Sequence, residues 1–381
     1  EQRQIIDRRL ILEDIENLRL NHSDEIIRRK NIFTRLQDAL EKGRAEVRLR
    51  FKSGKSTGTQ ASENLSFLFD QLVRVIHDVA AEVYPSPNPT IADRLSIAAV
   101  GGYGRNELAP YSDIDLLFLF PYKQTPRGEQ VVEYILYMLW DLGIKVGHST
   151  RSTSDCIRLA KRDLTVKTAL LESRFLWGDQ GLFLDFRKSF QEHVVSGTAL
   201  DFVDGKLAER DTRHKKLGDS RYLVEPNVKD GKGGLRDLQT LFWIAKYTHQ
   251  ADSVEDLLAY GVLSEDEARN FAKDKNFLWT VRFHLHYITE RAEERLTFDL
   301  QSLLAENMNY SPRAGSSGVE RFMKHYYLVA KDVGDLTRIF CAILEDRHRP
   351  TKKFGIFRVS YKLYVLSLTP IICFGKSLTN F

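Results

Sequence analysis

Leu95-Ser-Ile-Ala-Ala-Val-Gly-Gly-Tyr-Gly104 and Ser112-Asp-Ile-Asp-Leu-Leu-Phe-Leu-Phe120 are the two stretches that decide the fold. The first is a short apolar run that stops at glycines, which predicts a strand opening into a tight turn. The second starts with two aspartates and continues as an unbroken apolar run, which predicts a buried strand. A helical period over residues 128–142 and a third expected strand over residues 144–150 complete a small mixed sheet.

The two aspartates, Asp113 and Asp115, are the first candidates for chemistry. Because side chains alternate along a strand, both carboxylates face one side while Ile114 faces the core. Mg²⁺ takes one or two carboxylates and completes its octahedron with water and substrate phosphate. An Asp-x-Asp by itself is more often a solvated strand end, so the surrounding sequence decides whether it is a metal site. We predict that Asp113 and Asp115 are the catalytic pair and the metal ligands.

A glycine turn precedes this pair. Gly101 and Gly102 lack side chains, so backbone N–H groups there can approach a triphosphate. Strand, Gly-Gly turn, connector and strand with Asp-x-Asp is similar to the polymerase-β-like nucleotidyltransferases. We expect Gly101 and Gly102 to bind the nucleotide, with Arg105 contacting phosphate through its planar donors and Ser112 capping the turn or bonding a phosphate oxygen.

That superfamily usually supplies a third carboxylate from a neighbouring strand. The expected strand here, Lys145-Val-Gly-His-Ser-Thr-Arg151, contains none. Glu172 and Asp141 are candidates to supply the oxygen from helices, and His148 is a candidate for proton transfer, although a lone histidine at a strand end is more often structural. The third ligand and the general base stay open.

A second informative stretch is Glu225-Pro-Asn-Val-Lys-Asp-Gly-Lys-Gly-Gly-Leu-Arg-Asp-Leu-Gln239, a glycine-rich loop that runs into an apolar helix. A helix N-terminus with free N–H groups suits an anion. The alternative is an ordinary loop-to-helix junction. The candidates for substrate or phosphate contacts in this stretch are Lys229, Lys232, Gly233, Gly234 and Arg236.

The rest of the chain is largely helical in pattern. We predict an α+β, mostly helical protein, in which a polymerase-β-like nucleotidyltransferase sheet is followed by a helical domain. The expected parts are an N-terminal helical segment (1–60), a nucleotidyltransferase core (61–152), an associated helical domain (153–349) and a divergent tail (350–381).

Composition narrows the class of protein. The 381 residues are 43% hydrophobic and 28% charged, which is ordinary for a soluble globular protein, and the net charge of +4 gives no argument for a nucleic-acid partner. The cysteines, Cys156, Cys341 and Cys373, are too few and too scattered for a disulfide framework or a metal cluster. With no membrane-length apolar stretch and no secretory signal, we expect a cytoplasmic protein.

Three longer motifs carry a more specific likeness. They are residues 101–117, Lys145-Val-Gly-His-Ser149, and Asn227-Val-Lys-Asp-Gly-Lys-Gly-Gly-Leu-Arg-Asp-Leu-Gln239, and residues 295–301 and 319–324 extend them. Together these motifs resemble the bacterial PII uridylyltransferase/uridylyl-removing enzymes over roughly residues 60–348.

The resemblance implies transfer of UMP from UTP to a tyrosine of the PII nitrogen-regulatory protein, with Mg²⁺ and release of pyrophosphate. It places the family's active-site motif on Gly101, Gly102, Asp113 and Asp115. The family also carries an HD hydrolase domain and two ACT domains, and the chain is expected to stop before both. His77-Asp78 is expected to be a solvated helix face, so no uridylyl-removing activity is predicted.

Two alternatives remain open at this point. One is adenylyl transfer to another nitrogen-regulation protein, because the aspartates and the glycine turn determine the reaction but not the base. The other is a truncated, inactive module that binds nucleotide or PII, which the missing third carboxylate and the divergent tail motivate.

Overall fold

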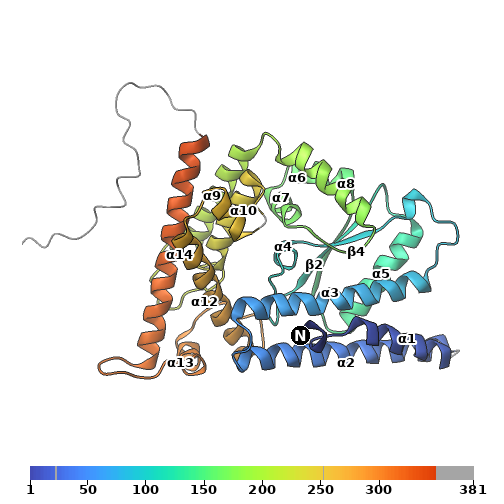
Figure 1. Cartoon of the computed structure of the whole chain (residues 1–381), viewed down its shortest axis with the longest axis horizontal. Helices are drawn as coiled ribbons and strands as arrows, with labels where there is room; N and C mark the ends of the chain where they lie inside the picture. Colours follow the sequence, from blue (N-terminus) through green and yellow to red (C-terminus); the bar gives the residue numbers. More distant parts are fainter. Residues whose placement is uncertain (22–23, 252, 349–381) are drawn as a thin grey trace, which may run out of the picture.

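The computed structural model describes residues 1–21, 24–251 and 253–348. A small sheet is embedded among helices (Figure 1), so the predicted mostly helical α+β architecture is confirmed. The expected tail, 350–381, lies outside the described residues. Within the described part, no helix has the length and apolar character needed to cross a membrane.

The sheet has four strands in the order β3-β2-β1-β4. Their bounds are β1 Ser96–Ala99, β2 Ile114–Phe120, β3 Val146–Ser152 and β4 Arg174–Gly178. β1 pairs antiparallel with β2 and β4, whereas β2 pairs parallel with β3, so the sheet is mixed as predicted. β4 was not expected, because it is short and follows a helical pattern. The sheet therefore extends past the boundary placed at residue 152.

Helices cover both faces of this sheet and form a separate group beside it (Figure 1). α3 and α5 lie on one face, with α6 and α8 on the other, and α9, α10, α12 and α14 stand to the side. The bounds are α1 Arg8–Asn21, α2 Glu25–Lys52, α3 Gly58–Val83, α4 Gly101–Gly104, α5 Pro126–Asp141, α6 Thr153–Ala160, α7 Leu164–Leu171, α8 Gln180–Phe190, α9 Ala199–Lys216, α10 Leu235–His249, α11 Val254–Ala259, α12 Glu265–Thr289, α13 Phe298–Asn307 and α14 Gly318–His348.

α3 joins the sheet to the helical group. It begins with a capping box, in which Thr57 and Gln60 satisfy each other's backbone N–H groups. Gly58 packs directly on the backbone of Thr280 in α12, where any larger side chain would collide. This close approach lets α3 pack tightly against α12.

The His77-Asp78 doublet is not a solvated face. Asp78 accepts hydrogen bonds from Arg8 of α1 and from the indole N–H of Trp177 in β4, the latter at 2.6 Å. Its carboxylate therefore holds α1 and β4 against α3. The prediction failed because both partners lie far from α3 in sequence.

A buried carboxyl in α12 gives a pH-dependent prediction. Burial, and then the like charge of Asp332, raise the pKa of Asp274 to about 7, opposed by Lys273. Because the pKa is higher in the folded state than in the unfolded state, the protonated carboxyl favours folding below about pH 4. This stabilisation is lost as the pH rises through about 7. Asp274→Asn should therefore raise the free energy of unfolding by about 1–2 kcal/mol at pH 8 and by little at pH 4. Urea unfolding at both pH values checks this; an equal gain at both would contradict it.

Candidate active site

A cavity of about 1010 Å³ lies where the sheet meets the helical group. One wall comes from α4, the connector and β2, and it carries Gly101, Gly102, Ser112, Asp113 and Asp115. The opposite wall comes from α9, α10, α12 and the loop before α10. The structure thus brings the predicted aspartates and glycines together in one cleft.

The predicted glycine turn forms a single helical turn, α4, directly after β1. Gly101 has φ +59°, which L-residues with side chains rarely adopt, and a Cβ there would lie 3.2 Å from the Asp115 Oδ2 atom. Gly104 lies against the backbone carbonyl of Glu172, where no Cβ fits. Both glycines are therefore required by close approaches, one of them to the aspartate pair.

Ser112 holds the connector in place. Its hydroxyl donates to the Ala109 carbonyl and accepts from the Ala109 N–H, both at 3.0 Å. These bonds close a turn immediately before Asp113. Of the two predicted roles, the structure shows the turn cap.

The two aspartates differ in exposure. Asp113 is exposed, whereas Asp115 is partly buried beside it. Burial, and then the charge of Asp113, raise the pKa of Asp115, while Lys229 lowers it. Placing a cation between the two carboxylates would relieve their repulsion, which is the behaviour expected of a metal site.

No third carboxylate stands beside this pair on β3. Gly147 is the register partner of Asp115, and a side chain there would collide with the Asp115 carboxylate. In the described part of the chain, no group of three or more His, Cys, Asp or Glu side chains could hold a metal. Two carboxylates with substrate phosphate and water still suffice for Mg²⁺, so the pair fits that ion.

The three residues considered as substitutes for the missing ligand lie in different places relative to the cleft. Asp141 is exposed at the end of α5 and does not line the cleft. His148 pairs in register with Leu116, so it faces the other side of the sheet from Asp115, and its ring contacts Trp140. Glu172 lines the cleft, but one of its oxygens is already bound by Arg105.

Arg105 is buried between two carboxylates rather than offered to phosphate. It donates to Glu107 at 2.8 Å and to Glu172 at 2.7 Å. Burial alone would lower the pKa of Arg105, but these two carboxylates raise it. The guanidinium therefore ties the end of α4 to Glu172, and the predicted phosphate contact is not what the structure shows.

The opposite wall of the cleft is strongly basic. Two predicted residues, Lys229 and Arg236, line it, and so do Lys206, Arg213 and Arg282, which sequence reasoning missed. Lys206 follows Phe202 and Val203 at helical spacing, and this buried position in α9 was the available signal.

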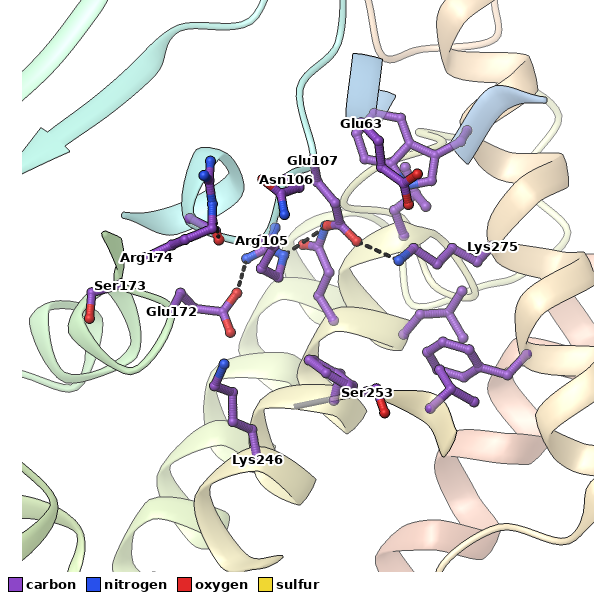
Figure 2. Close-up of a pocket in the computed structure, with 18 of the residues that line it drawn as sticks. Glu63, Arg105, Asn106, Glu107, Glu172, Ser173, Arg174, Lys246, Ser253 and Lys275 are labelled. Atoms are coloured by element: carbon purple, nitrogen blue, oxygen red, sulfur yellow. Dashed lines mark hydrogen bonds and ion pairs between the residues drawn. The ribbon is translucent and has the colours of Figure 1, made fainter. Parts of the chain in front are cut away.

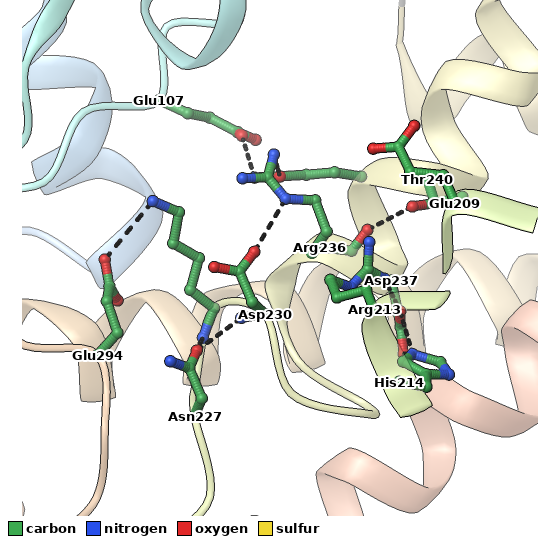
Figure 3. A network of polar contacts seen from close by, with 12 residues as sticks. Glu107, Glu209, Arg213, His214, Asn227, Asp230, Arg236, Asp237, Thr240 and Glu294 are labelled. Atoms are coloured by element: carbon green, nitrogen blue, oxygen red, sulfur yellow. Dashed lines mark hydrogen bonds and ion pairs between the residues drawn. The ribbon is translucent and has the colours of Figure 1, made fainter. Parts of the chain in front are cut away.

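Carboxylates hold these basic side chains in place (Figure 3). Arg236 Nε lies 3.1 Å from Asp230, and Lys229 Nζ lies 3.9 Å from Glu294. Burial lowers the pKa of Lys229, and the neighbouring Arg282 lowers it further. A polyanion entering the cleft would thus meet partly desolvated cations facing the two aspartates.

The other predicted contacts in this loop are not in the cleft. Lys232 pairs with Asp219 at 2.8 Å and lines a different cavity. Gly233 packs against the backbone of Ala330 and donates its N–H to Asp237 at 2.8 Å. Gly234 lies against carbonyl oxygens of its own loop.

The first amides of α10 are also occupied. The N–H of Leu235 donates to the Val228 carbonyl at 3.0 Å, and the N–H of Arg236 donates to the Lys229 carbonyl at 2.8 Å. This helix N-terminus is therefore closed by the loop itself, and these two amides are already hydrogen-bonded where the sequence suggested an anion site. Periodicity marked the start of the helix but could not reveal the folded-back loop.

Glu107 connects the two walls and was also missed. It accepts from Arg105 at 2.8 Å, from Lys275 of α12 at 2.8 Å and from Gln239 of α10 at 3.2 Å. Gln239 in turn accepts from Arg236 at 3.0 Å. Figure 3 shows this path from Glu107 to Arg236 and Asp230. The position of the basic wall is thereby coupled to the turn that carries the glycines.

Comparisons with known proteins agree with this geometry. A family model for the nucleotidyltransferase domain matches residues 88–175, and a model for the GlnD PII-uridylyltransferase matches residues 201–341. Domains of the first kind generally use a divalent metal ion. The two models fall on the sheet and on the helical group that face each other across the cleft.

Two curated relatives are both bifunctional uridylyltransferase/uridylyl-removing enzymes. The one from Azospirillum brasilense is 56% identical over 359 residues, which is 94% of this chain and 38% of the relative. The one from Rhodospirillum rubrum is 54% identical over 348 residues, which is 91% of this chain and 37% of the relative. The chain spans less than two fifths of the length of either. Over most of its length, the chain is therefore similar to part of the bifunctional uridylyltransferase/uridylyl-removing enzymes, and its residues 88–175 match the nucleotidyltransferase domain.

Proposed function

We propose that this chain transfers UMP from UTP to a tyrosine hydroxyl of the PII nitrogen-regulatory protein. The observation that carries the proposal is the cleft itself, in which an aspartate pair beside a glycine turn faces a basic wall. The names of the matching family model and of the relatives support the choice of uridylyl transfer over adenylyl transfer. We propose that this chain is active by itself, although it spans only part of the length of its relatives.

The reaction balances without further reagents. The tyrosine oxygen forms a bond to the α-phosphorus, the bond from that phosphorus to the oxygen bridging to the β-phosphate breaks, and pyrophosphate leaves. The hydroxyl proton goes to solvent or buffer, since no residue is assigned as its acceptor. Lys229, Arg236 and their basic neighbours would bind the triphosphate and neutralise the charge that develops on pyrophosphate.

Asp113 and Asp115 would hold Mg²⁺ in this reaction. The fit rests on the two adjacent oxygen donors and on the raised pKa of Asp115, which a cation would counter. When bound, the ion supplies charge neutralisation at the phosphates. Gly101 keeps the backbone close to the pair so that N–H groups of the turn can approach the same phosphates.

Base selectivity tests the proposal. The purified chain with Mg²⁺ and PII protein should transfer label from α-labelled UTP, and a tenfold excess of unlabelled ATP should leave most of the transfer intact. Preferential labelling from ATP would instead establish adenylyl transfer. Nucleotide binding without any labelled product would favour an inactive nucleotide-binding module.

A further inference from the structure

A second cavity of about 620 Å³ lies back to back with the nucleotide cleft. The two share a wall that includes Arg105, Glu107 and Glu172. We propose that this second cavity binds a neutral, partly aromatic small molecule that presents an amide or lactam edge, with an N–H donor beside a carbonyl acceptor.

Glu172 supplies the first argument. Its side chain is fully buried at 0% exposure, and its Oε2 atom accepts from Arg105 at 2.7 Å. The Oε1 atom is buried too, yet among the described residues it has no hydrogen-bond partner. Leaving a buried acceptor unpaired is unfavourable, and more so for a charged group. A ligand that offers an N–H donor would remove this cost.

Lys246 supplies the second argument. Figure 2 shows its side chain pointing from α10 across the cavity toward Glu172. Its ammonium carries three donors and no acceptor. A cationic ligand placed beside Glu172 would be repelled by this lysine, so the donor that the ligand offers to Glu172 should be a neutral N–H group. An amide edge supplies that donor without adding net charge.

The other residues that line the cavity are the reason for proposing a partly aromatic ligand. Phe175, Phe183, Phe242 and Phe271 all line the cavity, and Phe183 and Phe271 are buried. Rings pack on such side chains in offset or edge-to-face arrangements. Trp279 adds an indole N–H with no partner among the described residues, which is a donor for the ligand carbonyl.

Fragment binding tests the site, with benzamide as the probe. Calorimetric or ligand-observed NMR titration of the full chain should show benzamide binding about ten- to a hundredfold more tightly than N,N-dimethylbenzamide, which keeps the carbonyl and ring but lacks the N–H donor. Saturating UTP with Mg²⁺ should not displace benzamide, because the nucleotide occupies the other cavity.

A variant that fills the cavity completes the test. Val254 lines it at the start of α11, away from the ion pairs of the shared wall. Val254→Trp should weaken benzamide binding at least about tenfold, whereas the matched Val254→Ile should not; circular dichroism confirms that both fold. Equal binding of the two benzamides, displacement by UTP, or unchanged binding in a folded Val254→Trp chain would overturn the proposal. Benzamide binding needs no transferase activity, so it can still be interpreted if the proposed transfer of UMP is not found.

Discussion

Asp113→Asn and Asp115→Asn should each reduce uridylyl transfer by about a thousandfold or more, without loss of fold. The asparagines keep the size of the side chains but remove the charge that would hold a divalent cation on the nucleotide. Asp113 is exposed, so its replacement should change the free energy of unfolding by less than about 0.5 kcal/mol. The raised pKa of Asp115 means that burial and the nearby Asp113 disfavour its charge, so Asp115→Asn should be at least as stable as the unaltered chain at neutral pH.

Asp141→Asn is the matched control for these two variants. Asp141 is also an exposed carboxylate, and it lies outside the cleft. Initial rates with labelled UTP, taken beside thermal unfolding of each variant, separate chemistry from folding. Near-normal turnover in either Asp113→Asn or Asp115→Asn would remove the metal-site assignment.

Glu107→Gln should produce the largest loss of stability among single changes at the cleft, about 2–4 kcal/mol. The carboxylate accepts from Arg105, Lys275 and Gln239, and removing its charge leaves two cations incompletely compensated. Burial works against the charged form, but the charges and donors of Lys275 and Arg105 lower the pKa of Glu107 to about 2. Its contribution is therefore present above the unfolded pKa and lost as the pH falls toward 2.

Urea unfolding at pH 7 measures this effect. Glu133→Gln is the control, because Glu133 is exposed on α5 and does not line the cleft. In nucleotide assays, the unfolded fraction of the Glu107→Gln variant should also rise more steeply with temperature than the unfolded fraction of the Glu133→Gln control. Equal stability of the two variants would show that Glu107 does not join the two walls of the cleft.

The strand beside the aspartate pair could be predicted from sequence because its signals are local. Asp113 directly precedes the strand that holds Ile114 and Asp115, and Gly101 and Gly102 follow the preceding strand, so period and glycine placement sufficed. The same holds for the main helices, whose apolar spacing marked them within a few residues. The fourth strand was missed because five residues after a helix carry little periodic signal.

The basic wall could be predicted only in part because it depends on distant contacts. A local pattern shows that an arginine is present, but not that Glu107 and Glu172 enclose Arg105. It likewise suggests an open helix N-terminus before Arg236, where the loop carbonyls of Val228 and Lys229 have already taken the amides. Residues far apart in sequence decide which charges remain available to a ligand.

The most direct test of the proposed uridylyl transfer labels UTP at either end of its triphosphate. The chain is incubated with Mg²⁺, PII protein and UTP carrying either an α-phosphate or a γ-phosphate label. The account predicts that α-label appears on a PII tyrosine while γ-label is recovered only in pyrophosphate, and that both signals vanish in Asp113→Asn. Transfer of γ-label to PII, or no label on PII from a folded chain, would contradict it.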